Sequence, residues 1–410
     1  MELAVGEEPE DDPAGAIIDW LMLPATRGGT TDALIEELCA RLLAAGISLG
    51  RLALSIGTLH PQIISSAWIW SRQTGRARQV DQGHDILNRE AYLRSPLRAI
   101  HAGAPMVRQR LAGPGPDNDY PVAAEFREQG MTDYLALPLE FGSGTIEVFS
   151  VAADGPGGLS DADIGVLCAI RPALSTVVEM HNARRVSRTL LDTYLGHRSG
   201  AMVLDGRITR GSGETLHAVV WYSDLRGFTP MSDNLPRNEL IEVLNDWFGC
   251  MIGAVEENGG EVLKLVGDAV LAIFPLEDAA FRHYVCNRAL DTANLARRRM
   301  AEVNARREEA GRATLGFGIA LHTGDVIWGN IGSGNRLDFT VIGPAVNHVT
   351  RIEGLCKETG RNLLVSGTFA ATCERPLEEV GTFRLRGVED PRTVYAPPGN
   401  GTPVKAAPGK

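Results

Sequence analysis

The order of hydrophobic patterns between residues 216 and 322 is the feature that most constrains how this chain folds. His217–Asp224 is rich in β-branched and aromatic residues, as in a buried strand. From Leu240 onward, apolar residues recur at the i, i+3, i+4 and i+7 positions of an amphipathic helix. Glu261–Val266 and Ala269–Phe274 then read as two short strands joined by a tight turn. This stretch therefore predicts a strand, a helix and a hairpin, in that order.

A second helix and strand complete the pattern. Residues 278–309 carry helical periodicity, and Leu315–His322 again has the composition of a strand. The resulting β-α-β-β-α-β order predicts a ferredoxin-like core, with helices on one face of an antiparallel sheet. We therefore expect an α+β fold, in a domain that covers residues 216–395 and adds further strands and a helix after its core.

Residues 30–161 predict a separate α+β domain. Its strand-like runs include Ala67–Ser71 and Tyr134–Leu139, and a Phe-Gly-Ser-Gly sequence at 141–144 predicts a hairpin turn. The run that starts at Asp133 resembles the end of a GAF-type domain, which implies a regulatory domain that responds to an unknown small-molecule or protein signal. Four side chains are candidates for lining a ligand pocket, although core packing is the favoured interpretation: Trp68, Trp70, Tyr92 and His101.

Residues 162–215 predict a connecting helix followed by a hinge. Ser160 to Asp163 is a helix-start signal, and apolar residues continue at helical spacing to Leu195. Pro172 predicts an interruption or kink, and the glycine-rich stretch from 196 to 213 predicts a flexible hinge. The heptad-like spacing suggests a two-stranded coil through which a sensor acts on the second domain. The acidic segment 1–15 and the Pro-, Gly- and Ala-rich segment 396–410 are expected to be disordered.

Charge and hydropathy exclude some classes of partner. The 410-residue chain has a net charge of −11, so it has no overall attraction for the phosphate backbone of nucleic acids. It has no run of 18 apolar residues, so we expect no membrane span. Its N-terminus is acidic, unlike a signal peptide. We therefore expect a cytoplasmic protein.

Two carboxylates lie in turns of the chain that come to the same edge of the predicted sheet. Asp224 ends the first strand, and Asp268 lies in the hairpin turn. Two carboxylates at one edge can hold two divalent cations beside substrate phosphates. The turn at Gly227 precedes a helix, whose exposed N–H groups could cradle phosphates. Without further context, an Asp in a turn more often caps the turn.

Four longer segments supply that context. "WYSDLRGFT", "EVLKLVGDAVLAIF", "GIALHTGDVIWGNIG" and "FTVIGPAVNHVTRIE" occur in this order, and together they closely resemble the class III nucleotidyl cyclase catalytic domain over Leu216–Tyr395. The resemblance implies two Mg²⁺ or Mn²⁺ ions, held by Asp224, Leu225 and Asp268. It places the phosphate contacts at Gly227, Phe228, Thr229 and Arg386, with Arg384 an equal candidate for the last of these.

The resemblance also assigns the groups that bind the nucleoside. Asn347 would orient the ribose, and Arg351 would stabilise charge on the α-phosphate. Lys264 matches the purine-selecting residue of the family, and a Lys can donate to adenine N1. Counting back seven residues from Asn347 gives Thr340 as the second purine contact, the choice of one subgroup of the family. Asp338 is two residues out of that register, and we expect it to face the site only if a bulge intervenes.

The function implied is an adenylate cyclase that converts ATP to cyclic AMP and pyrophosphate. One chain carries both the metal carboxylates and the nucleoside contacts, which the family combines across two domains, so we expect a homodimer with two sites. Members of the Thr340 subgroup are often stimulated by bicarbonate, and we keep that response as a hypothesis. The alternatives are a guanylate cyclase, against which Lys264 argues, and a catalytically inactive nucleotide-binding regulator. His322, Thr323 and Gly324 match the family, but we expect them to have a packing role.

Overall fold

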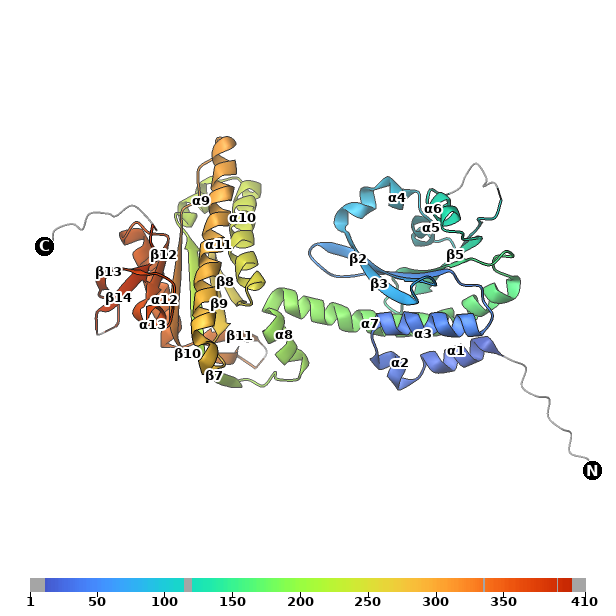
Figure 1. The fold of residues 1–410 in the computed structure, drawn as a ribbon, viewed down its shortest axis with the longest axis horizontal. Helices are drawn as coiled ribbons and strands as arrows, with labels where there is room; N and C mark the ends of the chain where they lie inside the picture. The colour runs from blue at the N-terminus through green and yellow to red at the C-terminus, as the bar shows by residue number, and fades with distance from the viewer. Residues whose placement is uncertain (1–11, 114–119, 335, 389, 400–410) are drawn as a thin grey trace, which may run out of the picture. The chain divides into compact units, whose positions relative to one another are not determined.

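The computed structural model describes residues 12–113, 120–334, 336–388 and 390–399. The chain divides into two compact units, residues 1–190 and 191–410, each with its own sheet (Figure 1). Residues 1–11 and 400–410, which fall in the segments expected to be disordered, lie outside the described part of the chain.

Unit 1 is built around one antiparallel sheet, with the strand order β3-β2-β1-β6-β5-β4. Its strands are β1 (Arg51–Gly57), β2 (Ile63–Ser71), β3 (Arg76–Gly83), β4 (Val107–Arg110), β5 (Asp133–Glu140) and β6 (Ile146–Ala153). Its helices are α1 (Pro13–Leu21), α2 (Pro24–Gly28), α3 (Thr31–Ala44), α4 (Glu90–Leu93), α5 (Pro96–His101), α6 (Val122–Glu128) and the first part of α7 (Asp161–Leu195). The predicted hairpin joins β5 to β6.

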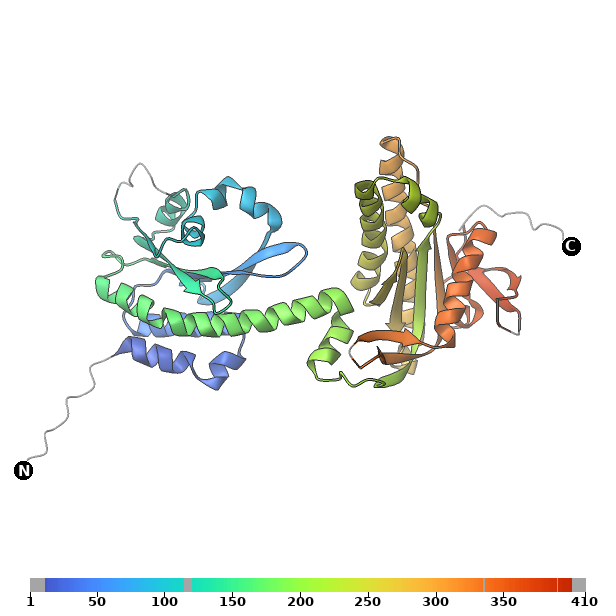
Figure 2. The ribbon, with the colours of Figure 1, turned by 180° about the vertical axis from the view of Figure 1, so that it is seen from behind.

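Helices cover both faces of this sheet. On one face, α3 and α7 pack over the large core that includes Leu38, Leu52 and Leu174. On the other face, α5 and α6 cover a smaller core around Phe126 and Tyr134, and α4 lies beside them (Figures 1 and 2). The alternation of buried and half-buried residues along β1 follows from this arrangement, because its inward side chains meet the α3 and α7 layer.

The first unit begins earlier than the sequence suggested. α1 starts at Pro13, inside the segment 1–15 that we expected to be disordered, and the Asp12 carboxylate accepts a hydrogen bond from the Gly15 N–H at 3.0 Å. Ile17 and Leu21 are buried in the α3 and α7 core. The acidic composition of the segment concealed a short amphipathic helix, whose apolar face is stabilised by burial rather than by its own propensity.

α7 is a single helix that leaves unit 1. The Ser160 and Asp163 side chains form the expected start signal, since each bonds the other's backbone N–H, at 3.1 and 2.8 Å. The helix does not end at Pro172, where we expected an interruption or kink. Within the described residues, α7 alone has the length and composition to cross a membrane, but a core helix meets the same criteria. Leu167, Leu174 and other apolar residues of α7 are indeed buried in unit 1.

The expected glycine-rich hinge is partly ordered. α8 (His197–Leu204) forms within it, and the backbone N–H and hydroxyl of Ser199 both donate to the Glu261 carboxylate, at 3.1 and 3.2 Å. Ser199 is fully buried. The prediction of a flexible hinge over the whole segment is therefore wrong, because α8 packs on unit 2 through contacts that are remote in sequence.

Unit 2 follows the predicted β-α-β-β-α-β order. Its strands are β7 (Gly213–Leu225), β8 (Glu261–Val266), β9 (Ala269–Pro275), β10 (Phe317–Gly332), β11 (Leu337–Ile342), β12 (Leu363–Ser366), β13 (Glu378–Phe383) and β14 (Arg392–Ala396). Its longer helices are α10 (Arg237–Glu257), α11 (Arg282–Glu309) and α12 (Pro344–Glu358), with the short α9 (Phe228–Asn234) and α13 (Gly367–Ala370). The core is α+β and ferredoxin-like, as expected.

The described strands of unit 2 form one sheet, in the order β13-β14-β12-β10-β7-β9-β8, with β11 paired to β10. β12 runs parallel to β10. α10 and α11 cover one face over a core that includes Trp221 and Trp247. α12 packs on the other face against residues such as Val220 and Ala320 (Figure 2). The helices of the core repeat thus share one face, as predicted, while the added helix covers the opposite one.

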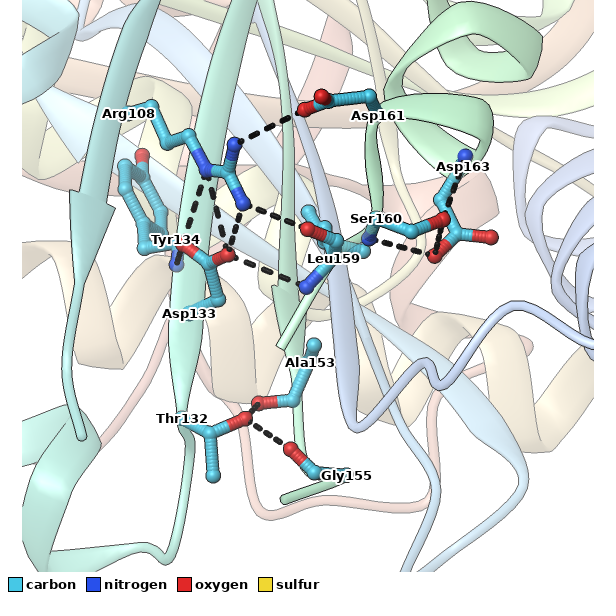
Figure 3. A network of polar contacts seen from close by, with 10 residues as sticks. All are labelled: Arg108, Thr132, Asp133, Tyr134, Ala153, Gly155, Leu159, Ser160, Asp161 and Asp163. Carbon is cyan, nitrogen blue, oxygen red and sulfur yellow. Dashed lines mark hydrogen bonds and ion pairs between the residues drawn. The ribbon is translucent and has the colours of Figure 1, made fainter. Parts of the chain in front are cut away.

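A buried ion pair fixes the start of α7 in unit 1 (Figure 3). The Asp133 carboxylate, fully buried, accepts hydrogen bonds from Arg108 Nη2 at 2.8 Å and from the Leu159 N–H at 3.1 Å. Arg108 Nη2 also donates to the Leu159 carbonyl at 2.5 Å. Gly158 has a φ of 67°, and a Cβ there would lie 2.8 Å from the Asp133 carboxylate. The bonds connect β4 and β5 to the residues just before α7.

We expect Asp133→Ala to destabilise unit 1 by about 3 kcal/mol, because it leaves Arg108 and the Leu159 N–H without their buried partner. Asp161→Ala is the matched control. It removes a carboxylate that is fully exposed and 3.8 Å from Arg108, and it should cost less than about 1 kcal/mol. Urea unfolding of the whole chain, followed by hydrogen exchange in peptides of unit 1, measures both. Equal effects would contradict this role for Asp133.

Candidate active site

Asp224 and Asp268 meet at one end of the unit 2 sheet. Asp224 is the penultimate residue of β7, opposite Gly318 of β10. Asp268 lies in the turn between β8 and β9, where Gly267 has a φ of 65°. Their carboxyl groups are close enough for a hydrogen bond. The indole N–H of Trp247 donates to the Asp268 carbonyl at 2.7 Å, so α10 holds this turn in place.

The environment of Asp224 disfavours its negative charge. Burial raises the pKa of Asp224 to about 7, and the hydrogen bond and charge of Asp268 and the charge of Glu353 add to this shift. Its Oδ1 atom is buried and has no hydrogen-bond partner among the described residues. A buried carboxylate oxygen without a partner, beside a second carboxylate, is stabilised by a divalent cation.

Glu353 is a third acidic group at this end of the sheet, and the sequence analysis assigned it no role. It lies on α12, and a Cβ added to Gly318, the residue opposite Asp224, would come within 2.1 Å of its Oε1. Burial raises the pKa of Glu353, Asp268 raises it further, and Arg226 opposes the shift. The only signal in the sequence was its place at the end of the motif "FTVIGPAVNHVTRIE", and periodicity could not show that α12 brings it to Asp224.

The residues expected around a metal fit such a group. No cluster of three or more metal-binding side chains occurs in the described part of the chain, so the Asp224–Asp268 pair would need oxygen ligands from the backbone or the substrate. Leu225, the third expected ligand, is buried directly after Asp224. Gly227 has a φ of 73° and caps α9, and Phe228 and Thr229 follow in its first turn. The expected phosphate-binding turn thus adjoins the carboxylates in sequence.

Lys264 pairs with Asp338, and this differs from our expectation. The Lys264 ammonium forms an ion pair with the Asp338 carboxylate. β11 pairs with β10 without a shift in register, placing Asp338 opposite Ile331 and Thr340 opposite Gly329. Residues two apart on a strand share a face, so Asp338 needs no bulge to face the same way as Thr340. The expectation that Asp338 needs a bulge to face the same side is therefore wrong. Asp338 and Thr340 lie on one face of β11.

Asn347 and Arg351 lie one turn apart on α12. Asn347 is exposed and Arg351 is half-buried. The loop after β13 passes the Arg351 guanidinium, since a Cβ added to Gly387 would lie 3.5 Å from its Nη2. This loop also carries Arg384 and Arg386, both exposed. The structure therefore brings the expected basic residues of α12 and of this loop into one neighbourhood.

The candidate residues form separate groups within one chain. One group contains Asp224, Asp268 and Glu353, and another is the Lys264–Asp338 pair. Arg351 and the loop at Gly387 form a third. Among the residues that the structure describes, no hydrogen bond or ion pair joins the carboxylates to Asn347 or Arg351. Within the described part of one copy of unit 2, the two sets of groups are thus not bonded to each other.

The four pocket candidates of unit 1 separate into two pairs. Tyr92 and His101 line a cavity of about 650 Å³ between the sheet and the segments over it, and their side chains share a hydrogen bond of 3.0 Å. Trp68 and Trp70 are buried in the α3 and α7 core instead. The core-packing interpretation is therefore confirmed for the two Trp residues, because alternation along β2 turns them away from the cavity. Glu147 also lines the cavity, and burial raises its pKa to about 6.

Comparisons with known proteins identify the second unit. Residues 213–395 match the family model of the adenylate and guanylate cyclase catalytic domain. A protein named adenylate cyclase from Anabaena cylindrica is 35% identical over 182 residues, which are 44% of this chain and 34% of that protein. Adenylate cyclase 1 of Rhizobium meliloti is 27% identical over 181 residues, 42% of this chain and 26% of that protein.

A crystal structure of the guanylyl cyclase Cya2 is 31% identical, covers 47% of this chain and 97% of that chain, and aligns with a TM-score of 0.41. The chain spans about a third of the length of the first curated relatives it matches. The match over residues 213–395 confirms the resemblance that the four sequence segments carried. The GAF-like character of the first domain stays a prediction.

We expect Mn²⁺ to raise the unfolding temperature of unit 2 by a few degrees, and by more at about pH 8 than at about pH 6. The reason is that protons compete with the metal for Asp224, whose pKa is raised to about 7. Without metal, the stability due to the protonated carboxyl is complete below about pH 4 and is lost as the pH rises through about 7. Calorimetry with and without Mn²⁺ measures both effects.

Asp224→Asn should abolish the stabilisation by Mn²⁺ and flatten the pH dependence of the unfolding temperature. The amide does not ionise, and it cannot serve as one of the two carboxylate ligands of the metal. Asp246→Asn, at an exposed position on α10, is the control and should behave like the unchanged protein. Stabilisation by Mn²⁺ that persists in Asp224→Asn would rule out this metal site.

Proposed function

We propose that this chain, whose residues 213–395 form a class III nucleotidyl cyclase catalytic domain, converts ATP to 3′,5′-cyclic AMP and pyrophosphate. The observation that carries the proposal is the pair of carboxylates, Asp224 and Asp268, at one end of the sheet, with a buried oxygen that lacks a partner. Two relatives named adenylate cyclase support the choice of product. We also propose that the protein acts in the cytoplasm.

Asp224 and Asp268, with Leu225 beside them, would hold two Mg²⁺ or Mn²⁺ ions. When bound, such ions activate the ribose 3′-hydroxyl and neutralise phosphate charge. The chain's own part is positioning and electrostatics: the 3′-oxygen bonds to the α-phosphorus as the bond to pyrophosphate breaks. Arg351 would stabilise the charge on the α-phosphate, and Asn347 would orient the ribose. Gly227, Phe228, Thr229 and Arg386 would contact the remaining phosphates.

Lys264 supports ATP over GTP. An ammonium is a donor, which suits N1 of adenine, whereas N1 of guanine is itself a donor and favours an acceptor. The ion pair with Asp338 orients Lys264 along the face of β11 that also bears Thr340. We therefore propose that Lys264 and Thr340 contact the purine, and that Asp338 positions the ammonium.

Two copies of the chain would complete each site. No hydrogen bond or ion pair joins the carboxylates to Asn347 or Arg351 in the described part of one chain, and two chains related by a two-fold axis would supply both sets twice. The proposed enzyme is therefore a homodimer. Thr340 matches the subgroup of the family that is often stimulated by bicarbonate, so we also propose that bicarbonate stimulates this enzyme. The assay below, repeated with bicarbonate, tests this response.

We further propose that unit 1 regulates unit 2 through α7. The cavity beside Tyr92 and His101 is of a size for a small-molecule signal. The Asp133 network ties the start of α7 to the sheet of unit 1. A ligand that displaces that sheet would therefore displace α7.

The purified chain should form cyclic AMP from ATP with Mg²⁺ or Mn²⁺, and far less cyclic GMP from GTP. Asp224→Ala should lose activity, and Lys264→Glu should lower kcat/KM for ATP while raising it for GTP, because an acceptor replaces the donor. Chromatography of the products measures both. Cyclic GMP as the main product of the unchanged chain would support the guanylate cyclase alternative, and no product from a dimeric chain would support the inactive regulator.

A mixing experiment tests the shared site. Asp224→Ala and Arg351→Ala should each lose on the order of 10²–10³ in rate. When the two are mixed, half of the dimers at random association are hybrids with one intact site, so activity should return to about a quarter of the unmutated level. If the mixed variants are shown to exchange subunits but regain no cyclase activity, a site made by two chains is contradicted.

The coupling through α7 can be tested by changing its length. Two residues inserted after Arg188 rotate everything that follows by about 200° and should change the cyclase rate. Seven inserted residues leave the rotation almost unchanged and are the control for added length. Equal rates for the two insertions would rule out coupling by helix rotation.

A further inference from the structure

A second cavity lies in unit 2, beside α12 but lined by none of the candidate active-site residues. Its volume is about 710 Å³, within the range of sites that take small organic molecules. His322 and Thr323 of β10, for which we expected a packing role, form one wall. His348 and Ile352 of α12 and Arg392 of β14 line it as well.

His322 is a buried polar group in the wall of this cavity. The residue is only 8% exposed. Its Nδ1 atom lies 3.3 Å from the Thr368 hydroxyl. That hydroxyl donates to the Thr323 carbonyl at 2.9 Å, so it can only accept from His322. Nε2 has no hydrogen-bond partner among the described residues. A Cβ at Gly324 would lie 3.1 Å from it, so the glycine leaves this nitrogen uncovered.

Two basic residues, His348 and Arg392, line the cavity beside this imidazole. The His348 ring meets it edge-on, with 5.2 Å between ring centroids. Burial lowers the pKa of His322 to about 4, and the charges of His348, Arg392 and His217 lower it further. The carboxylate in the lining, Asp325, is engaged by His217 at 2.6 Å. Among the residues that the structure describes, no carboxylate lies within ion-pair distance of Arg392.

Another part of the wall is apolar. Ile352, Leu385, Pro344 and Pro391 line the cavity there, beside the hydroxyl groups of Ser366, Thr368 and Thr393. An inorganic anion would leave this surface wet, whereas an organic group of several carbon atoms would bury it. Burying apolar surface contributes about 25 cal/mol per Å², so the wall selects for a ligand that has both an apolar part and a charged group.

We propose that this cavity binds a small organic anion, whose carboxylate or phosphate group lies between Arg392 and His348, beside the His322 ring. Its apolar part would lie against Ile352 and Leu385. The proposal concerns a site other than the one that binds ATP, and it does not rest on cyclase activity. It gives the ligand a route to the reaction, because His348 and Ile352 directly follow Asn347 and Arg351 on α12.

The test is binding of defined probes to the full chain, without nucleotide and with EDTA, so that no metal ion can hold a phosphate at the active site. Benzoate and phenyl phosphate carry the two possible head groups, and benzamide is the neutral isostere of benzoate. Calorimetry measures affinity, and the ring signals of ¹³C-labelled histidine, assigned with His322→Gln and His348→Gln, report the place of binding.

We expect one or both anions to bind with saturation and to shift the signals of His322 and His348, and benzamide to bind at least about tenfold more weakly. The anion that binds more tightly identifies the head group. Arg392→Gln should weaken binding at least about tenfold. Arg375→Gln, which removes an exposed guanidinium paired with Asp291, is the matched control and should bind normally.

Three results would overturn the proposal: no saturable shift at His322 with either anion, equal binding of benzamide, or unchanged binding by Arg392→Gln. None of them bears on the formation of cyclic AMP, which is measured separately.

Discussion

The pairing of β7 with β10 is the interaction on which unit 2 depends. The two strands pair over the whole length of β7, from Gly213 opposite Gly329 to Leu225 opposite Phe317. β7 is also bonded to β9, so its middle residues are buried on both faces. α10 and α11 cover one side of this pair and α12 covers the other. The pairing thus fixes where β7 ends, and with it the place of Asp224.

The same strand pair carries the second half of the candidate site. β10 also pairs with β11, from Ile327 to Gly332, and this pairing brings Asp338 to Lys264. The polypeptide then turns at Gly343 into α12. The carboxylates and the candidate nucleoside contacts are therefore attached to one sheet, although no hydrogen bond or ion pair joins them in the described part of one chain. A dimer of rigid units can join them without remodelling either one, which favours a precise site over an adaptable one.

The carboxylates at the end of β7 are unfavourable for folding without a cation. The negative charges of Asp224, Asp268 and Glu353 act on one another, and the pKa values of Asp224 and Glu353 are raised. The well-packed cores around Trp221 and Trp247 offset this repulsion. Charge repulsion at one place, compensated by stable packing in the rest of the domain, is typical of functional sites. Unit 1 shows the opposite case, since its buried Asp133 is fully bonded and serves to anchor a helix.

The sequence by itself determined the order of elements in unit 2, the turn at Asp268 and the family of the domain. These depend on local periodicity and on motifs, which the chain carries whatever its tertiary contacts. Only the tertiary structure decided that Tyr92 and His101 line a cavity whereas Trp68 and Trp70 do not, that the charge of Glu353 acts on Asp224, and that Asp338 meets Lys264. It also decided that α1 and α8 are ordered, and that a cavity opens beside His322. Each of these depends on which face of a strand or helix meets a segment far away in the chain, and periodicity gives the faces of an element but not its neighbours.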